Sequence, residues 1–271
     1  MITMILDNDI ENIKIYDKSG IDRIFIDLEI NGKKERQGHL DTVISSHNLE
    51  DIKKIKPILK NSKLLVRVNP IHENSRAEIS KVINNGADIV MLPMFKTVTE
   101  VKTFIKHVGN KARTCLLLET SEALVRIDDI LEIDGIDEVH IGLNDLHLSL
   151  GLDFMFELMG SNLVEYITKK IKSKNIPFGV GGVARMTEGM LKGNIIIKEH
   201  VRLGSSMVIL SRTFKRNLEL DKNIIRKELK ALNLVEKSAK NLTDEELQAN
   251  KLLLKKLAKD IAFIIKHKNN V

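Results

Sequence analysis

Short apolar runs alternate along the chain with longer stretches in which apolar and polar residues recur at helical spacing. The expected strands occupy residues 2–6, 22–28, 62–68, 87–93, 112–119, 137–142, 176–182 and 200–206. Each is short and largely apolar, which is typical of strands covered on both faces of a parallel sheet. Helix-like segments lie between most of them, for example 48–60, 73–86, 97–109, 121–134 and 162–174. Eight strands alternating with helices predict an α/β protein with a (β/α)8 TIM barrel.

A doubly wound sheet is the alternative arrangement for alternating strands and helices. The number of strands and the lack of a glycine-rich phosphate-binding sequence after the first strand favour the barrel. The strand pattern stops after Phe214, and two helical stretches are expected near residues 219–240 and 243–268. We therefore predict a barrel catalytic domain over residues 1–214 and a C-terminal helical extension over residues 215–271.

The last helical stretch has a defined start and a seven-residue apolar repeat. Thr243 as N-cap and Glu246 three positions later fit a capping box. The apolar positions that recur every seven residues are Leu247, Leu254 and Ile261, together with Leu257 and Ile264. This face can pack on the barrel or on a partner subunit, and the sequence leaves both open.

The whole formal charge of +6 lies in the C-terminal extension. Residues 215–271 carry 14 Lys and Arg against 8 Asp and Glu, so the rest of the chain is neutral. A basic segment can bind nucleic acid. Here, however, the lysines alternate with apolar residues at helical spacing, which favours a solvated helix face. We therefore expect no nucleic-acid partner.

The composition predicts a globular, cytoplasmic protein. The chain has 271 residues and is 43% apolar, which allows a sizeable core. Its one cysteine, Cys115, excludes a disulfide framework, and its place in an apolar run favours a small buried hydrophobe over a nucleophile. No run approaches the roughly 20 apolar residues of a membrane span. The N-terminal segment also lacks the basic start of a signal peptide.

Polar and ionisable side chains stand where several expected strands end. They are Asp27, Glu29, Arg67, Asn69, Glu119, Asn144 and Asp145. In a (β/α)8 barrel such strand ends face one shared pocket. Two carboxylates from adjacent strands make a hard oxygen site suited to Mg²⁺ or Mn²⁺, and an arginine binds a substrate carboxylate bidentately. Together they predict a site for a 2-oxo acid. Helix capping by Glu119 and a structural salt bridge of Arg67 are the simpler alternatives.

Four segments carry a family pattern: LLVRVNP, GADIVMLPM, LLLETSEALVRIDDILEIDGIDEVHIGLNDLHLSLG and HVRLGSS. They resemble the HpcH/HpaI aldolase and citrate lyase β-subunit family, over about residues 2–214. The resemblance implies a metal-dependent barrel that makes or breaks carbon–carbon bonds next to an enolate, usually of pyruvate or an acetyl group.

The resemblance also implies roles for individual residues. Glu119 and Asp145 would be the Mg²⁺ ligands, and Arg67 would contact the substrate carboxylate and oxyanion. Gly142, Asn144 and Asp145 would bind the substrate, the last two through backbone N–H groups. Family members are commonly trimers or hexamers that exchange C-terminal helices, so a homo-oligomer formed through these helices is expected.

The chain departs from the family pattern in the half of the site that moves protons. Ile30 stands where the pyruvate aldolases have an acid–base histidine, and Leu117 stands where they have a glutamine. The DLE run before Ile30 is closer to the citrate lyase branch. His47 is the replacement base that we expect, and His39 in the long polar loop 31–46 is the second candidate.

The sequence therefore predicts a Mg²⁺- or Mn²⁺-dependent carbon–carbon lyase, or the reverse condensation. It would act through the enolate of pyruvate, or of a related 2-oxo acid or acyl carboxylate. The alternative is a non-catalytic or regulatory barrel that binds a small carboxylate, because the acid–base histidine is missing. Among the other polar residues, His140 is expected to be packed in the barrel wall, and Arg185 to reach either the rim or the surface.

Overall fold

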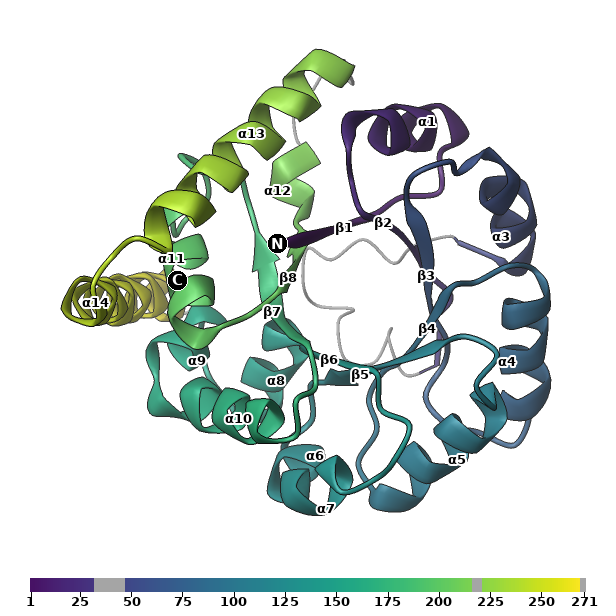
Figure 1. Ribbon diagram of the computed structural model, residues 1–271. Helices are drawn as coiled ribbons and strands as arrows, with labels where there is room; N and C mark the ends of the chain where they lie inside the picture. The colour runs from purple at the N-terminus through teal and green to yellow at the C-terminus, as the bar shows by residue number, and fades with distance from the viewer. Residues whose placement is uncertain (32–46, 216–220, 269–271) are drawn as a thin grey trace.

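Eight parallel strands close into one barrel in the order β1 to β8 (Figure 1). The computed structural model describes residues 1–31, 47–215 and 221–268. The strands are β1 (Ile2–Leu6), β2 (Arg23–Asp27), β3 (Lys63–Arg67), β4 (Ile89–Leu92), β5 (Arg113–Leu118), β6 (Glu138–Ile141), β7 (Phe178–Val183) and β8 (Met207–Leu210). The predicted (β/α)8 barrel is confirmed, and a doubly wound sheet is excluded because β8 pairs with β1.

Helices surround the strands (Figure 1). Those between consecutive strands are α1 (Ile10–Ser19), α3 (Leu49–Ile55) with the 3₁₀ turn η1 (Lys56–Ile58), α4 (Ser75–Asn84), α5 (Val98–Val108), α6 (Ser121–Val125), α7 (Ile127–Leu131), α8 (Leu143–Ser149), α9 (Phe156–Gly160), α10 (Asn162–Ser173) and α11 (Gly193–Leu203). Their sequences set their ends. A capping box between Thr97 and Glu100 begins α5, and Gly109 ends it in the left-handed conformation at φ 56°.

The last strand lies downstream of the place that the sequence pattern gave it. The prediction of a strand at residues 200–206 is wrong, because the first half of this stretch is the end of α11. It continues the amphipathic helical spacing of the residues before it, so the helix runs on. Gly204 ends the helix with φ 74°, and the apolar run that follows forms β8.

The inner face of the barrel explains how the polar strand ends come together. Side chains alternate between the two faces along a strand. The inner apolar cluster consists of Met4, Phe25, Leu65, Ile89, Met91, Cys115, Leu117 and Met207. Asp27, Arg67 and Glu119 each follow a member of this cluster by two residues. They therefore lie on the same inner face, at the carboxyl ends of their strands.

A buried ion pair lies at the other end of the barrel. Arg23 donates from Nη1 and Nη2 to the Glu138 carboxylate over 2.5 and 2.8 Å, and Arg113 lies 3.0 Å from the same carboxylate. Cys115 is buried, as predicted. Burial raises the pKa of its thiol, and the Glu138 carboxylate raises it further. The thiol is therefore protonated and unsuited to act as a nucleophile.

Two buried histidines are kept neutral, one in the barrel wall and one on a surrounding helix. His140 of β6 shares a hydrogen bond with the Gly181 carbonyl oxygen over 2.9 Å, and His200 of α11 shares one with the Ser205 hydroxyl over 2.9 Å. Burial lowers the pKa of His140 to about 4 and that of His200 to about 3. His140 is thus packed in the wall, as predicted, and does not belong to the strand-end pocket.

We expect acid to destabilise the protein through these two histidines. The unfolded chain binds their protons near the ordinary pKa of about 6.5, whereas the native protein binds them only near pH 3 to 4. The contribution of these histidines to the free energy of unfolding is therefore fully present above about pH 6.5. Below that pH, the free energy of unfolding falls by on the order of 1 kcal/mol per pH unit for each histidine. Urea unfolding between about pH 7.5 and about pH 5 measures this slope.

A pair of variants separates this effect from general acid sensitivity. His200→Gln removes one of the two buried imidazoles and should make the pH slope of stability shallower. His267→Gln changes an exposed histidine near the C-terminus and should leave the slope as it is. Equal slopes in wild type and His200→Gln would contradict the prediction.

The chain beyond β8 is helical, as predicted. It forms α12 (Arg212–Lys215), α13 (Lys222–Ala239) and α14 (Asp244–Lys268). Thr243 and Glu246 make both hydrogen bonds of the predicted capping box, over 3.2 and 2.8 Å. Helix α13 packs against α1 and α11, and α14 packs against α9 and α11. The predicted domain border after residue 214 falls inside α12 and stays a prediction.

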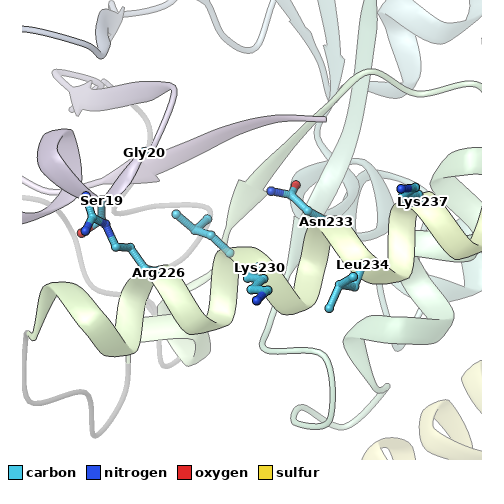
Figure 2. Close-up of a pocket in the computed structure, with 8 residues that line it drawn as sticks. Ser19, Gly20, Arg226, Lys230, Asn233, Leu234 and Lys237 are labelled. Carbon is cyan, nitrogen blue, oxygen red and sulfur yellow. The ribbon is translucent and has the colours of Figure 1, made fainter.

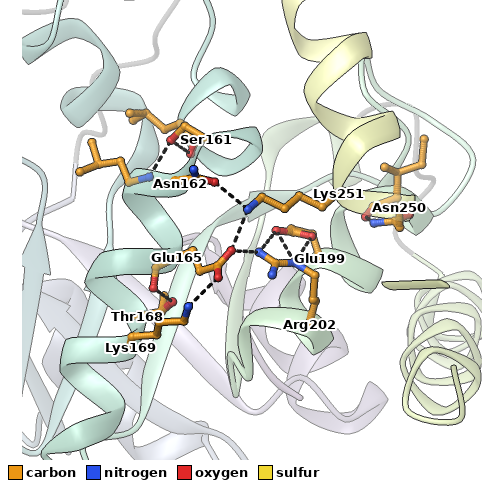
Figure 3. Close-up of polar contacts among 12 residues, drawn as sticks. Ser161, Asn162, Glu165, Thr168, Lys169, Glu199, Arg202, Asn250 and Lys251 are labelled. Atoms are coloured by element: carbon orange, nitrogen blue, oxygen red, sulfur yellow. Dashed lines mark hydrogen bonds and ion pairs between the residues drawn. The ribbon is translucent and has the colours of Figure 1, made fainter. Parts of the chain in front are cut away.

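Charged side chains fix α14 to the barrel helices (Figure 3). Lys251 of α14 is buried, and its Nζ donates to the Asn162 side chain over 3.0 Å and to the Glu165 carboxylate over 2.7 Å. Arg202 of α11 joins Glu165 to the fully buried Glu199. Since buried charges are stable only when they are paired, this cluster specifies how α14 is oriented on α10 and α11.

The first part of the apolar repeat of α14 packs inside the protein, and the later part is exposed to solvent. Leu247 and Leu254 are buried, whereas Ile264 is 49% exposed. The side chains of Leu252 and Phe263 on this helix are exposed as well. The repeat thus packs on the protein's own helices at Leu247 and Leu254, and association of subunits through the C-terminal helices stays a prediction.

Three basic residues of α13 line a groove beside α1 (Figure 2). Arg226, Lys230 and Lys237 are exposed and line a groove beside the end of α1. Arg226 also donates to the Lys18 carbonyl oxygen over 2.9 Å, which ties α13 to α1. The absence of a nucleic-acid partner stays a prediction. Among the described residues, no helix has the length and hydropathy that crossing a membrane requires.

Candidate active site

Arg67 is held by two carboxylates at the end of β2. The register of β2 and β3 pairs Asp27 with Arg67, so these inward side chains are neighbours. Arg67 Nε and Nη2 donate to the two oxygens of Asp27, each over 2.9 Å, and Nη2 lies 3.3 Å from Glu29 Oε2. Burial by itself lowers the pKa of Arg67, but Asp27 and Glu29 outweigh it and the pKa is raised. The guanidinium is therefore charged and fixed in orientation.

Glu119 is a buried carboxylate at the end of β5. Its side chain is only 3% exposed, and its Oε1 accepts a hydrogen bond from the Met94 backbone N–H over 3.1 Å. Burial raises the pKa of Glu119 well above its ordinary value, repulsion by Asp145 raises it further, and Arg67 opposes both. The structure thus places the other predicted metal ligand, Asp145, and the predicted substrate-binding Arg67 each within electrostatic reach of Glu119.

The backbone of Met94 is a part of the site that the sequence did not indicate. Met94 follows β4 and has φ 51°, a left-handed conformation that non-glycine residues adopt at a cost. This conformation accompanies the hydrogen bond from its N–H to the Glu119 carboxylate. A backbone donor has no side-chain pattern, so sequence analysis had no means of finding it.

Asp145 and Asn144 lie in the first turn of α8, directly after β6. Both are half-buried. The carboxylate of Asp145 stands at the positive end of the helix dipole, which is the favourable end for an acid. Gly142 separates the strand from the helix and packs on Glu119. A Cβ at position 142 would lie 2.7 Å from Glu119 Oε2 and 2.8 Å from Glu119 Cβ.

We expect Gly142→Ala to disable the carboxylate pair. The methyl group has no room unless Glu119 shifts, and misplacing one ligand should lower Mg²⁺ or Mn²⁺ affinity at least about tenfold. Calorimetric Mn²⁺ titration measures the loss. In a Glu119→Ala background, Gly142→Ala should cause no further loss, because the displaced side chain is already gone. A full second loss there would show that Gly142 acts by another route.

The donor set fits a hard divalent cation. Glu119 and Asp145 offer carboxylate oxygens, which Mg²⁺ and Mn²⁺ prefer, and a cation between them would relieve the repulsion that raises the pKa of Glu119. Within the described parts of the chain, no group of three or more His, Cys, Asp or Glu side chains could hold a metal ion. Water and substrate oxygens would therefore complete the coordination, as is usual for Mg²⁺.

His47 lies against the backbone of Asp27. Its Nδ1 accepts the Asp27 N–H over 3.0 Å, so the neutral ring carries its proton on Nε2. Burial lowers the pKa of His47, although nearby Asp27, Asp51 and Asp7 oppose the change. The ring is therefore neutral near pH 7 and orients Asp27. Its predicted catalytic role stays a prediction, and His39 lies outside the described residues.

The remaining polar candidates have structural partners. Asn69 Oδ1 accepts from the backbone N–H groups of Ile30 and Asn31 over 2.9 and 3.1 Å, so it fixes the chain after β2. Ile30 itself is 60% exposed. Arg185 donates to the Phe214 carbonyl oxygen over 3.2 Å. This contact anchors α12, so Arg185 holds the chain beside the rim.

Comparison with known proteins gives a consistent relationship. A family model described as HpcH/HpaI aldolase/citrate lyase matches residues 6–180. A hydroxypyruvate/pyruvate aldolase of Rhizorhabdus wittichii is 30% identical over 105 residues, which are 29% of this chain and 42% of that protein. One of Roseobacter denitrificans is 25% identical over 147 residues, 43% of this chain and 57% of that protein. A 2-keto-3-deoxy-L-rhamnonate aldolase of Salmonella newport is 32% identical over 114 residues, which are 31% of this chain and 42% of that protein.

These sequence matches span less than two thirds of the length of the curated relatives. The solved structures match over nearly the whole chain. An HpcH/HpaI aldolase from Desulfitobacterium hafniense aligns with a TM-score of 0.62 at 16% identity, covering 89% of this chain and 93% of that one. The citrate synthase SbnG aligns with a TM-score of 0.60 at 19% identity, covering 88% of this chain and 93% of that one. At these identities the structural likeness establishes the fold.

Proposed function

The chain belongs to the HpcH/HpaI aldolase/citrate lyase family, and from this premise we propose that it is a metal-dependent carbon–carbon lyase for a 2-oxo acid. The observation that carries the proposal is the set of inward side chains at one end of the barrel. There Arg67 is held by Asp27 and Glu29, and both Arg67 and Asp145 lie within electrostatic reach of the Glu119 carboxylate. Such a set suits a substrate with a carboxylate next to a carbonyl group.

Arg67 is proposed to bind the substrate carboxylate. Its Nε and one Nη2 hydrogen are directed at Asp27, so the two N–H groups of Nη1 can donate to the ligand. The two flanking carboxylates keep the guanidinium plane fixed, which lowers the ordering cost of binding. The first turn of α8 is proposed to bind the substrate through the backbone N–H groups of Asn144 and Asp145, since N–H groups in a first turn lack acceptors within the helix. The Gly142 N–H donates to the Leu118 carbonyl oxygen over 2.9 Å, so Gly142 is proposed to contribute by leaving space beside them.

Glu119 and Asp145 are proposed to hold Mg²⁺ or Mn²⁺. A divalent ion there supplies a Lewis acid, which polarises a carbonyl oxygen and stabilises negative charge that develops on it. The chain's own contribution is positional. The Met94 N–H fixes one oxygen of Glu119, and Gly142 leaves room for its carboxylate.

His47 is proposed to act through Nε2. Since Nδ1 is occupied by the Asp27 N–H, the neutral ring can donate a hydrogen bond from Nε2, and it can take up a proton only if Nδ1 releases the Asp27 N–H. Deuterium exchange of the pyruvate methyl protons, followed by NMR in D₂O with Mg²⁺, tests the proposal. The protein should accelerate exchange well beyond Mg²⁺ alone, and EDTA should stop it. No acceleration with Mg²⁺ or Mn²⁺ would refute the proposal.

A non-catalytic barrel that binds a small carboxylate is the second candidate. It is favoured by Ile30, an exposed apolar residue at the position where the family resemblance predicts an acid–base histidine. Calorimetric binding of pyruvate without proton exchange would support this candidate over the lyase. Proton exchange in the same sample would exclude it.

A further inference from the structure

A cavity opens at the rim of the barrel beyond β7 and β8. It has a volume of about 230 Å³. Its apolar lining comprises Phe154, Met155, Phe156, Met190, Leu191 and Ile196. Its polar lining follows β8 and consists of Ser211, Arg212 and Thr213. Phe154 and Phe156 meet edge to face with ring centroids 5.4 Å apart, and both are buried, so the wall they form is rigid.

The cavity borders the inner face of the barrel at Gly182. Gly182 lines it, and a Cβ at that position would lie 3.2 Å from the Ile209 carbonyl oxygen and 3.9 Å from Ser211 Cβ. Ile209 packs on the inner apolar cluster, so Gly182 faces the same interior as Asp27 and Arg67. Because position 182 is a glycine, it places no side chain of its own between the cavity and the barrel interior.

The direction of a bound substrate follows from the order of the strands. In a closed barrel of eight strands, β3 and β7 lie on opposite sides (Figure 1). Arg67 ends β3, and the carboxylate pair stands at β5 and β6, between the two sides. A 2-oxo acid with its carboxylate on Arg67 and its carbonyl at Glu119 and Asp145 therefore directs carbon 3 towards β7 and β8.

We infer that the cavity beyond β7 and β8 binds an apolar chain attached to carbon 3 of the 2-oxo acid. The inference rests on the proposed function, because it uses the orientation that Arg67 and the carboxylate pair impose. The preferred substrate class is then a 2-oxo acid longer than pyruvate whose far end is a small apolar group. A cavity of about 230 Å³ is smaller than the roughly 300 to 1,000 Å³ that a drug-sized ligand occupies, so it suits a side group and not a whole molecule.

Calorimetry with 2-oxo acids of increasing chain length tests this inference without requiring turnover. The probes are pyruvate, 2-oxobutanoate, 2-oxopentanoate and 2-oxohexanoate in the presence of Mg²⁺. Affinity should rise about fourfold for each added methylene, which corresponds to about 0.8 kcal/mol per buried CH₂. 2-Oxoglutarate has as many carbons as 2-oxopentanoate but ends in a carboxylate. Tighter binding of 2-oxoglutarate would show that Arg212 in the lining takes a charged group, and it would overturn the assignment to an apolar chain.

Variants assign the effect to this cavity. Gly182→Leu fills it from the barrel side at a backbone position without positive φ. Met190→Asp places a charge on a side chain that is 63% exposed, so folding should tolerate it. Both should abolish the gain in affinity with chain length. The matched control is Leu234→Asp on α13, 58% exposed and outside the cavity, which should keep the gain.

The outcomes distinguish failure of the inference from failure of the proposed function. Proton exchange of pyruvate together with equal affinity for all four acids would overturn the inference but would still support the proposed lyase function. A rise with chain length without exchange would support the cavity and refute the lyase. Absence of binding by all four acids would overturn both. A rise in affinity that persists in both cavity variants would overturn the assignment of the effect to this cavity.

Discussion

Glu119→Gln is expected to abolish Mg²⁺-dependent proton exchange of pyruvate, with a loss of more than about 100-fold. Even residues that only support a metal ligand typically account for 10- to 100-fold effects, and Glu119 is proposed to be a ligand. Glutamine keeps the size and the acceptor oxygen that the Met94 N–H needs. It removes the negative charge that would attract the cation. The loss should therefore come from metal binding and not from misfolding.

Thermal unfolding with and without Mg²⁺ separates these two causes. The wild-type protein should gain stability as Mg²⁺ is added, since a ligand that binds the native state alone stabilises it. Glu119→Gln should unfold cooperatively and show no such gain. Glu122→Gln, on α6, is the matched control, because its side chain pairs with Lys96 outside the barrel interior. A Mg²⁺-dependent gain that survives in Glu119→Gln would show that the ion binds elsewhere.

Arg67→Lys is expected to lower kcat/KM for the 2-oxo acid by about 100-fold although the charge is kept. Lysine has no planar fork, so it cannot hold both oxygens of Asp27 while it donates to a substrate carboxylate. Two charge-assisted hydrogen bonds, each contributing about 1.5 to 3 kcal/mol, are at stake. The guanidinium would also leave its place over the Phe25 ring, where it lies 5.7 Å from the ring centroid.

Direct binding of pyruvate measured by calorimetry shows whether the loss is one of affinity. We expect Arg67→Lys to weaken binding, and Arg126→Lys, a change at an exposed arginine on the outside of the barrel, to have no effect. Unchanged pyruvate affinity in Arg67→Lys would mean that Arg67 is a structural partner of Asp27 and Glu29. That is the simpler role that the sequence alone had left open.

Most of the fold could be predicted from the chain because local spacing encodes it. Seven of the expected strands overlap the observed ones, since short apolar runs and helical spacing are properties of neighbouring residues. The eighth was wrong where these two patterns meet. The stretch before Gly204 is apolar enough for a strand, but it completes the buried face of α11, and the helix ran on until the glycine ended it. Tertiary packing decided between the two patterns.

The sequence by itself determined which strand ends carry charge and that the chain belongs to the HpcH/HpaI aldolase/citrate lyase family. Only the tertiary structure decided how these residues are used. The pairing of Arg67 with Asp27 depends on the register of two strands, and the space for the Glu119 carboxylate depends on a glycine beyond the neighbouring strand. Such contacts join residues distant in the chain, so they exist only once the barrel has closed.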